Sequence, residues 1–499
     1  MPAEVISSRI APPKASAMLE ALRGLGYNTA TALADIVDNS IAAGARVVSL
    51  NFCWKGRQST IIVMDDGAGM SPSELDLAMR LGEKNPLELR PAHDLGRFGL
   101  GLKTASFSQC RRLTVAASKD GHTASLRWDL DVIAESKDDG WLLLEGPAKG
   151  SQDLLKPLED HVHGTLVLWE NLDRIVTEGY TEQNFLDTVD RVEQHLAMVF
   201  HRFLEGPHPR LRILINDRPV TPWNPFHFST WSSPVERIPT EAGPVEVQCH
   251  VLPHRDRLDQ RDYEIAGGPE GWTAQQGFYV YRKKRLLLAG SWLGLGHGRS
   301  WTKEEAHRLA RIRLDIPDSA DAEWKLDIRK SSARPPVSVR SKLTRLAEDT
   351  RSRARQVFAH RGNVRAVGSL PLVEVWKVEN LAGGVRYRID MEHPAVRAVL
   401  DDAGPILPQV KAMLRVIEET VPVQRIWLDT AEGKDVPRTQ FAGNPSSEVL
   451  SVLEVMYRNM IVRKGMSPCA AKELLLHTEP FQDYPELVKG LPDQVQTTK

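Results

Sequence analysis

The pattern of apolar and polar positions predicts both strands and helices in the N-terminal part of the chain. Residues 59–65, "STIIVMD", form a short apolar run that ends at Asp65, which is typical of a buried strand. Ser71 precedes the next apolar positions, and serine is a favoured residue at a helix N-terminus. Residues 181–204 carry apolar side chains at intervals of three and four, which predicts an amphipathic helix.

Residues 32–45, "ALADIVDNSIAAGA", predict a helix that combines an apolar core face with polar side chains. The positions expected to face the core are Leu33, Ile36, Val37 and Ile41. The same run holds Asp35, Asp38 and Asn39. Because Asp35 and Asn39 are one helical turn apart, they project from one face of the helix. A solvated helix face would explain each polar residue separately.

The rest of the chain predicts further domains. A Gly-Pro break at 206–209 precedes "RLRILINDRPVTPWNPF", which predicts a strand, a turn and a strand, and the hairpin-like "GFYVYRKKRLLLAG" follows. Residues 339–366 predict one helix. The last part alternates amphipathic helices with strand-like segments, namely "VEVWKVEN", "VRYRIDM" and "VQRIWLD". The expected division is a first domain at 1–205, a second α/β domain at 206–336, a basic helix or linker at 337–365, and a small α+β domain of unknown role at 366–499.

Composition places the chain among globular proteins. Apolar residues make up 41% and charged residues 26%, and no apolar run approaches the roughly 20 residues that span a bilayer, so no membrane association is expected. The N-terminus lacks the pattern of a secretory signal and the four cysteines lack metal-binding spacing, so we expect a cytoplasmic protein with reduced thiols. With a net charge of −1, nucleic-acid contact would need a local basic patch.

A D-x-G-x-G motif follows the strand that ends at Asp65. Its glycines, Gly67 and Gly69, allow the backbone to adopt positive φ and to approach a flat ligand closely. The carboxylate can accept a hydrogen bond from an exocyclic amine such as that of adenine. For an isolated motif of this kind, a β-turn with a surface aspartate is the better explanation.

A glycine-rich segment, "DLGRFGLGLKTASFS", precedes a helix expected from about Leu102. Gly96, Gly99 and Gly101 would present backbone N–H groups at a helix N-terminus, which favours phosphate, and Lys103 adds a positive charge. A dinucleotide-binding site is the competing interpretation, but it requires a strand immediately before the glycines. The preceding segment is polar and contains prolines, so we interpret residues from about 81 to 101 as a lid.

The polar residues of the first helix complete a hypothesis of nucleotide chemistry. The amide oxygen of Asn39 can ligate Mg²⁺, which prefers oxygen ligands and would bridge to phosphates held by the glycine segment. Asp35 could orient or deprotonate a water for attack on a γ-phosphate. A solvated helix face explains each residue alone, but it does not explain why these residues and the two glycine motifs occur together in this order.

Together these motifs resemble the GHKL superfamily of ATPases, which includes gyrase, a heat-shock chaperone, histidine kinases and MutL. The resemblance covers the N box with Asp35 and Asn39, the adenine box from Asp65, the glycine lid box, and a later strand, "HGTLVLWENL", with Gly164 and Thr165. It implies a Bergerat-type ATP-binding α/β sandwich followed by a transducer-like α/β domain. It also implies that ATP with Mg²⁺ is bound by Asn39, Asp65, Gly67, Gly69, Met70, Gly96, Phe98, Gly99, Leu100, Gly101, Lys103 and Thr165.

Two positions depart from the family pattern. Asp35 stands where the gyrase, chaperone and MutL branches have glutamate, so slow hydrolysis is expected. Ala42 stands where the family often has aspartate, and the surrounding "AAGA" resembles the "DAGA" of MutL-like and MORC-like proteins. About thirty residues precede the N box, too few for the dimerising helices of a histidine kinase, so the bacterial MORC-like and MutL-like branch is expected.

The second domain resembles the transducer of these ATPases. Its segment "WKLDIRKSSARPP" resembles the MutL segment that delivers a lysine to the γ-phosphate, which implies a catalytic role for Lys330, with Lys325 and Arg329 as neighbours that could be confused with it. An exposed lysine at a strand end is the alternative. Residues 329–365 contain eleven Lys or Arg and two acidic residues, a strip that could neutralise DNA phosphates, although such a run is more often a solvated helix face. The cluster "YRKKR", residues 281–285, is a second basic element.

The expected function is therefore an ATP-hydrolysing conformational switch, in which ATP closes the lid and the transducer and joins two chains into a homodimer. By analogy with MORC, MutL and gyrase, double-stranded DNA is the expected object of such a clamp, and bacterial defence or restriction is a setting that this analogy suggests. A chaperone-like or scaffold switch with little hydrolysis, acting on protein partners encoded nearby, is the alternative from another class. A structural protein with a vestigial pocket is a third hypothesis, which Asp35 and Ala42 leave open.

Overall fold

A computed structural model describes residues 13–82, 101–136, 140–321, 323–325, 333–359, 373–381, 384–432 and 447–493. These residues belong to two compact units, Met1–Asn363 and Val364–Lys499, and each unit is described by itself. The predicted ligands Gly96, Phe98, Gly99 and Leu100 and the predicted catalytic Lys330 lie outside the described residues.

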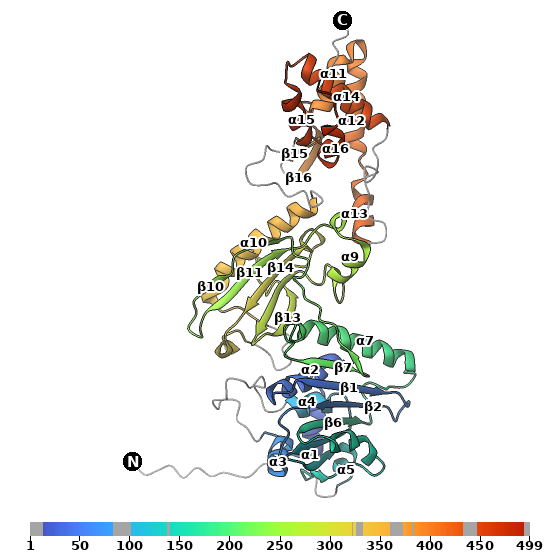
Figure 1. Ribbon diagram of the computed structural model, residues 1–499, viewed down its shortest axis with the longest axis vertical. Helices are drawn as coiled ribbons and strands as arrows, with labels where there is room; N and C mark the ends of the chain where they lie inside the picture. The colour runs from blue at the N-terminus through green and yellow to red at the C-terminus, as the bar shows by residue number, and fades with distance from the viewer. Residues whose placement is uncertain are drawn as a thin grey trace, which may run out of the picture. The chain divides into compact units, whose positions relative to one another are not determined.

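An eight-stranded sheet forms the base of the first unit (Figure 1). Its strand order is β5-β4-β3-β6-β2-β1-β7-β8, and all neighbours are antiparallel except β1 and β7, which are parallel. The strands are β1 (Val47–Cys53), β2 (Thr60–Asp65), β3 (Arg112–Lys119), β4 (His122–Asp129), β5 (Leu144–Glu145), β6 (Gly164–Glu170), β7 (Arg212–Ile215) and β8 (Arg218–Pro219).

The two faces of this sheet carry separate cores because successive strand residues point to opposite sides. In β2, Ile61 and Val63 join the large helix-covered core, whereas Ile62 and Met64 pack with a smaller cluster against α6. The helices are α1 (Ala15–Arg23), α2 (Thr29–Ala42), α3 (Pro72–Met79), α4 (Gly101–Phe107), α5 (Leu130–Glu135), α6 (Lys156–Glu159), α7 (Glu182–Val199) and α8 (His201–Leu204).

Several sequence predictions are confirmed in this region. The strand that ends at Asp65 is β2, and Ser71 is the N-cap of α3, with its hydroxyl accepting from the backbone N–H of Glu74. The helix predicted at 181–204 is α7, interrupted at Phe200 before the short α8. The four predicted core residues of α2 are buried.

The strand–turn–strand segment after residue 206 was expected to open the second domain, and that placement is wrong. Its two strands, β7 and β8, extend the first sheet, because β7 pairs in parallel with β1. The Asn-Asp turn itself is confirmed, with Asn216 and Asp217 both at positive φ. The side chain of Asn216 accepts from the backbone N–H of Phe52 in β1 at 2.8 Å, which fixes the turn to the first sheet.

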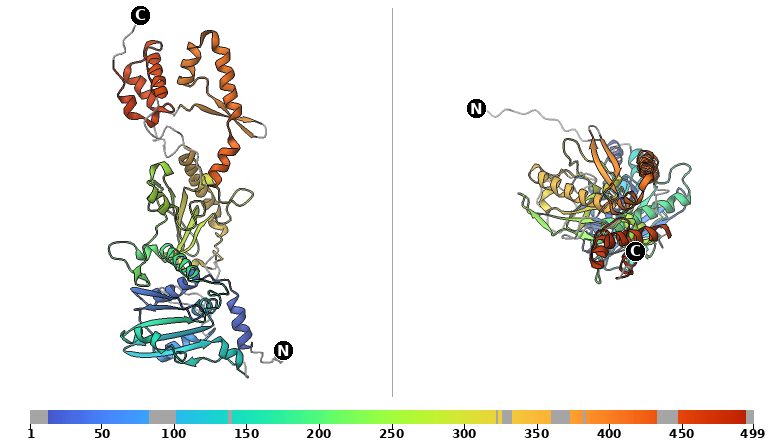
Figure 2. Two further views of the ribbon diagram at one scale, coloured as in Figure 1. Left: turned by 90° about the vertical axis from the view of Figure 1, so that its right-hand side faces the viewer. Right: turned by 90° about the horizontal axis from the view of Figure 1, so that it is seen from above.

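A six-stranded second sheet follows, with order β10-β11-β14-β12-β13 and β9 paired with β11. Its strands are β9 (Trp231–Ser232), β10 (Glu236–Ile238), β11 (Val245–Val251), β12 (Gly277–Arg282), β13 (Arg285–Ser291) and β14 (Ala310–Asp315), with α9 (Gln260–Gly267) between β11 and β12. Helix α10 (Val337–Ala359) packs on β11 and β14, as the two side views show (Figures 1 and 2). Along α10, Val339, Leu343, Ala354 and Val357 are buried and Leu346 is partly buried.

The second unit combines one hairpin with a set of helices. The hairpin is β15 (Trp376–Leu381) and β16 (Gly384–Ile389), and the helices are α11 (Pro394–Asp402), α12 (Leu407–Thr420), α13 (Val423–Glu432), α14 (Ser447–Val462), α15 (Pro468–Leu476) and α16 (Pro485–Lys489). The segment "VQRIWLD" was predicted as a strand, and this is wrong: it begins α13, because its apolar residues Val423 and Ile426 follow helical spacing. Among the described helices of both units, none has the length and apolarity to cross a bilayer.

Candidate functional site

Helix α2 is fixed at its N-terminus by a reciprocal cap. The Asn28 side chain accepts from the backbone N–H of Thr31 at 2.8 Å, and the Thr31 hydroxyl accepts from the backbone N–H of Asn28. The helix is then buried on nearly all sides, and Asp35 and Asp38 are only 8% and 2% exposed. Asn39 is exposed, so its amide oxygen is open to a ligand while Asp35 is enclosed by protein.

Two groups from outside α2 contact the Asp35 carboxylate. The hydroxyl of Tyr27 donates to Asp35 Oδ2 at 2.9 Å, and the guanidinium of Arg285 lies 3.8 Å from Oδ1. Arg285 also donates through Nε to the carboxylate of Asp38 at 3.1 Å. Sequence reasoning missed both Tyr27 and Arg285. No local pattern singles out Tyr27, and Arg285 was interpreted as part of a basic surface cluster.

The interpretation of "YRKKR" as a basic surface element is wrong for most of its members. Tyr281 is fully buried, and Arg282 and Arg285 are 9% and 6% exposed. The exposed residue of the turn is Lys284, with Lys283 half-buried beside it. The reason is that this hairpin joins β12 to β13 and directs Arg285 at α2, so its cations serve contacts inside the protein.

A partly buried histidine lies beside the ion pair of Arg285 with Asp38. His195 belongs to α7, and burial, assisted by the neighbouring positive charge of Arg285, lowers its pKa to about 4. The imidazole is therefore neutral near pH 7, so it does not add a second positive charge beside Arg285. The ring of Phe200 packs 5.9 Å from the guanidinium carbon.

The predicted adenine-binding carboxylate, Asp65, is buried at the end of β2. The Ser40 hydroxyl donates to its Oδ2 at 2.8 Å and the Gly67 N–H donates to its Oδ1 at 3.0 Å. Burial raises the pKa of Asp65, and these hydrogen bonds oppose that shift. In the β2–β6 ladder, Thr165 stands directly opposite Asp65. The structure thus brings together three of the four motifs: the N-box helix, the D-x-G-x-G loop and the Gly-Thr strand.

Close packing explains the glycines of this loop. Gly69 has φ +65°, and a Cβ atom built on it would lie 1.8 Å from the carbonyl oxygen of Ser118 in β3. A Cβ on Gly67 would lie 2.9 Å from the Cβ of Ala43 at the end of α2. The loop can therefore sit against both α2 and β3 only without side chains at these positions. Met70, the next predicted ligand, is half-buried against the main core.

Helix α4 begins at Gly101 and carries Lys103. The Lys103 side chain is 3% exposed, and its Nζ donates to the carbonyl oxygen of Ala78 in α3 at 2.8 Å. The ammonium thus helps to hold the end of α3, and its contact with phosphate stays a prediction. Lys325, Arg329 and Lys330 are the three cations predicted near the γ-phosphate, and only Lys325 belongs to the described residues. Its side chain is exposed, and its backbone has φ +49°.

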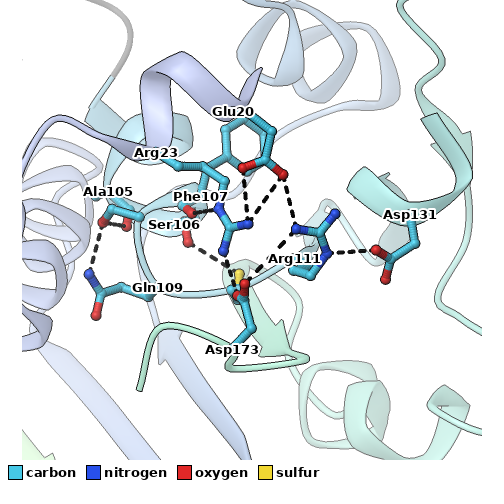
Figure 3. A network of polar contacts seen from close by, with 11 residues as sticks. Glu20, Arg23, Ala105, Ser106, Phe107, Gln109, Arg111, Asp131 and Asp173 are labelled. Atoms are coloured by element: carbon cyan, nitrogen blue, oxygen red, sulfur yellow. Dashed lines mark hydrogen bonds and ion pairs between the residues drawn. The ribbon is translucent and has the colours of Figure 1, made fainter. Parts of the chain in front are cut away.

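Figure 3 shows the polar network that joins α1 to α4. Arg23 is 4% exposed, donates through Nε to the carbonyl oxygen of Phe107 at 2.8 Å, and pairs with Asp173. Arg111 extends the network to Glu20 and Asp131 on the more exposed side. This network fixes the C-terminal end of α4.

The side-chain oxygen atoms of Asp65 and Asn39 fit ATP with Mg²⁺. Two carboxylate oxygens accept up to about four hydrogen bonds, so Asp65 retains capacity for an amine beyond Ser40 and Gly67. The exposed amide oxygen of Asn39 suits Mg²⁺. The described residues contain no group of three or more His, Cys, Asp or Glu side chains that could hold a metal.

Residues 27–165 match the family described as histidine kinase-, DNA gyrase B-, and HSP90-like ATPase. The chain contains a GHKL ATPase domain. It is 30% identical over 191 residues to a DNA mismatch repair protein MutL of Rhodospirillum rubrum, covering 38% of this chain and 26% of that protein. It is 35% identical over 112 residues to a MutL of Paramagnetospirillum magneticum, covering 22% and 18%. It is 31% identical over 96 residues to ATPase morc-1 of Caenorhabditis elegans, covering 19% and 11%.

These matches confirm the predicted superfamily and its affinity to MutL and MORC proteins, and the α/β fold agrees with them. The GHKL domain and its MutL and MORC relatives support an ATP-binding switch. The chain spans about a quarter or less of the length of these relatives, so the likeness concerns this domain and its surroundings.

Proposed function

We propose that this protein is a cytoplasmic, Mg²⁺-dependent ATPase that hydrolyses ATP slowly and uses it to close a dimeric clamp on DNA. The observation that carries the nucleotide part is Asp65, a buried carboxylate already oriented by Ser40 and Gly67 beside the N-box helix. Such a fixed acceptor suits the exocyclic amine of adenine, because little reorganisation is needed on binding.

The roles of the residues follow from their chemistry. Asp65 accepts from the adenine amine, and Asn39 supplies an amide oxygen to Mg²⁺, which would neutralise phosphate charge. Asp35 takes a proton from the water that attacks the γ-phosphate, so that ADP and phosphate leave. Tyr27 donates to one oxygen of Asp35 and so fixes the orientation of the carboxylate. Lys330 is the cation that we assign to the γ-phosphate on the resemblance to MutL.

The clamp proposal rests on two supports. The relatives include proteins named for DNA mismatch repair and a MORC ATPase. Helix α10 also presents exposed arginines, among them Arg345 and Arg355. Such cations would bind DNA through its phosphates, with an affinity that falls as salt rises.

One observation favours the alternative switch, which acts on protein partners: several cations of α10 contact groups of the same chain. Lys342 pairs with Glu236, Arg340 donates to the carbonyl oxygen of Gly294, and Arg353 lies over the ring of Trp231. Arg351 is buried between Trp292 and Trp301. Arg351 is thus removed from the surface, and the other three cations already have partners within the first unit, which leaves less unpartnered positive charge for DNA than the sequence suggested.

Phosphate release in the presence of Mg²⁺ and ATP tests the enzyme proposal. The wild type is compared with Asp35→Asn, each with and without double-stranded DNA. We expect turnover in the wild type, loss of at least about a hundredfold in the variant, and stimulation by DNA. Equal turnover in the two proteins would remove Asp35 from the mechanism, and ATP binding without turnover would favour the scaffold switch.

DNA retention on a gel separates the two switches. The variant Arg345→Glu with Arg355→Glu removes exposed charge, and the exposed Lys284→Gln in the second sheet is the matched control. We expect the double variant to lose retention and the control to keep it. Unchanged retention, or none in the wild type, would overturn the DNA clamp.

A further inference from the structure

Arg285 of the second sheet makes polar contacts with the N-box helix α2. We infer that Arg285 is a positioning residue for the hydrolytic carboxylate. It holds Asp38 and Asp35 of α2, and hydrolysis therefore depends on the position of the second sheet against α2. This inference rests on the proposed role of Asp35 as the group that activates water. Arg285 itself is not assigned to the substrate.

The geometry of the three side chains supports this role. Arg285 Nε lies 3.1 Å from Asp38 Oδ2 and 3.2 Å from Oδ1, while its Nη2 lies 3.8 Å from Asp35 Oδ1. Asp38 follows Asp35 by three residues, so both carboxylates face the same side of α2. The stronger contact with Asp38 therefore anchors the guanidinium at a fixed place beside Asp35.

Asp35 is consequently held from two directions. Tyr27 donates to Oδ2, and the backbone oxygen of Tyr27 in turn accepts from the side chain of Gln109 at 3.4 Å. The positive charge of Arg285 lies on the side of Oδ1. A carboxylate that takes a proton from water must present its lone pair in a fixed direction, so two such contacts favour catalysis beyond any effect on folding.

Contacts between α8 and the second sheet fix the position of the hairpin that carries Arg285. His201 of α8 is hydrogen-bonded through Nε2 to the hydroxyl of Tyr281 in β12 at 2.9 Å, and Arg202 pairs with Asp315 in β14. The guanidinium of Arg202 also lies over the Tyr281 ring at 3.4 Å. Movement of the second sheet against α8 would therefore displace β13, and with it the contact of Arg285 with α2.

The burial of the ion pair allows catalytic positioning to be separated from folding. Arg285→Gln takes a positive charge away from the buried Asp38, which destabilises the protein whatever the role in catalysis. Changing both members, with Arg285→Gln and Asp38→Asn, replaces the two charges of this pair by a neutral hydrogen-bonding pair of similar shape. A purely structural ion pair predicts that stability and turnover recover together in this double variant. A positioning residue predicts that stability recovers and turnover does not.

The experiment measures turnover by phosphate release, ATP affinity by calorimetry, and thermal unfolding in the full chain. It compares wild type, Arg285→Gln, Asp38→Asn, the double variant, Asp35→Asn, and Lys284→Gln as a control from the exposed turn of the same hairpin. We expect the double variant to unfold near the wild-type temperature, to bind ATP within about threefold of wild type, and to lose about tenfold or more in turnover. Lys284→Gln should match the wild type.

The other outcomes would overturn either the role of Arg285 or the role of Asp35. Turnover of the double variant within about threefold of wild type would reduce Arg285 to a structural role while the proposed function stands. Loss of ATP affinity in proportion to turnover would assign Arg285 to nucleotide binding instead of positioning. Equal turnover of wild type and Asp35→Asn would overturn the proposed role of Asp35, and this inference would fall with it.

Discussion

At the residue scale, Gly69 shows how closely the adenine-binding loop is packed. Gly69 and Gly44 both have positive φ, at +65° and +79°, so an alanine at either site is strained. Only Gly69 faces a backbone atom: its added Cβ would lie 1.8 Å from Ser118 O, whereas nothing lies within 4 Å at Gly44. Comparison of the two sites therefore separates backbone strain from steric clash.

We expect Gly44→Ala to lower the free energy of unfolding by about 1 kcal/mol and Gly69→Ala by about 3 kcal/mol or more. Gly69→Ala should also weaken ATP binding, because the loop that positions Asp65 must shift to relieve the clash. Urea unfolding and calorimetry with ATP measure the two effects. Similar losses of stability at the two sites would mean that the loop yields easily and that its packing against β3 is unimportant.

Two histidines with lowered pKa values, His195 and His250, predict how stability depends on pH. Burial, with the charge of Arg313 nearby, lowers the pKa of His250 from 6.5 to about 4, as burial and Arg285 do for His195. Above pH 6.5 these imidazoles are neutral in both the folded and the unfolded chain. As the pH falls, the unfolded chain takes up protons first, so stability is present in full above pH 6.5 and is lost as the pH falls through about 4.

We expect His250→Gln to remove its share of this loss, up to about 3 kcal/mol, because glutamine keeps a polar partner for Ser232 without titrating. The free energy of unfolding, measured between pH 7 and pH 4 by urea titration, should fall less steeply in this variant. The exposed His122→Gln is the control and should leave the slope unchanged. An unchanged slope in His250→Gln would show that other groups govern the acid response.

At the element scale, α1 is attached to the C-terminal end of α4 through Arg23 and Phe107. Arg23 is nearly fully buried and serves Phe107 O and Asp173, whereas Arg111 is about a quarter exposed and serves the outer part of the network. Without Arg23 the buried carbonyl oxygen of Phe107 loses its donor, which costs free energy, whereas the carboxylates around Arg111 are exposed enough for water to replace the cation.

We therefore expect Arg23→Met to lower the free energy of unfolding by about 2 kcal/mol and Arg111→Met by less than about 1 kcal/mol. Arg23→Met should also weaken ATP binding, because α4 carries Gly101 and Lys103, which are predicted to contact phosphate. Chemical unfolding and ATP titration check both effects. If ATP binding is unchanged in a destabilised Arg23→Met, α4 does not need its attachment to α1 for nucleotide binding.

The sequence predicted those elements whose information is local. The strand ending at Asp65, the cap at Ser71 and the core face of α2 follow from short patterns, and the superfamily followed from motifs in order along the chain. The β7–β8 hairpin was assigned to the wrong sheet, because its hydrogen-bond partner β1 is distant in sequence. The segment that begins α13 was short enough for its apolar residues to suit either a strand or a helix.

The candidate site shows the same limit. Asp35, Asn39 and Asp65 were proposed from motifs, and their nucleotide contacts stay predictions. The contact of Arg285 with Asp38 joins residues 247 positions apart, so no local pattern could reveal it. In the sequence, Arg285 belongs to a run of four basic residues, and only the fold shows that the turn exposes Lys284 and buries Arg285.

At the scale of the whole molecule, the proposed clamp requires that ATP changes the association of chains. A nucleotide that binds only the closed dimer shifts the equilibrium by its differential affinity for the two states. We expect the wild type with Mg²⁺ and a non-hydrolysable ATP analogue to approach twice the 55.8 kDa of one chain in light scattering. Asp65→Asn should stay a monomer, because it presents one acceptor oxygen where Ser40, Gly67 and adenine need several.

The same two proteins distinguish a clamp from simple electrostatic binding. A closed ring holds circular DNA through a high-salt wash but releases linear DNA from its ends, whereas phosphate contacts alone weaken with salt on both forms. We expect circular DNA to be retained by the wild type only with the ATP analogue, and by Asp65→Asn under neither condition. Equal release of circular and linear DNA would rule out the ring. A mass that does not depend on nucleotide would favour the scaffold switch acting on protein partners.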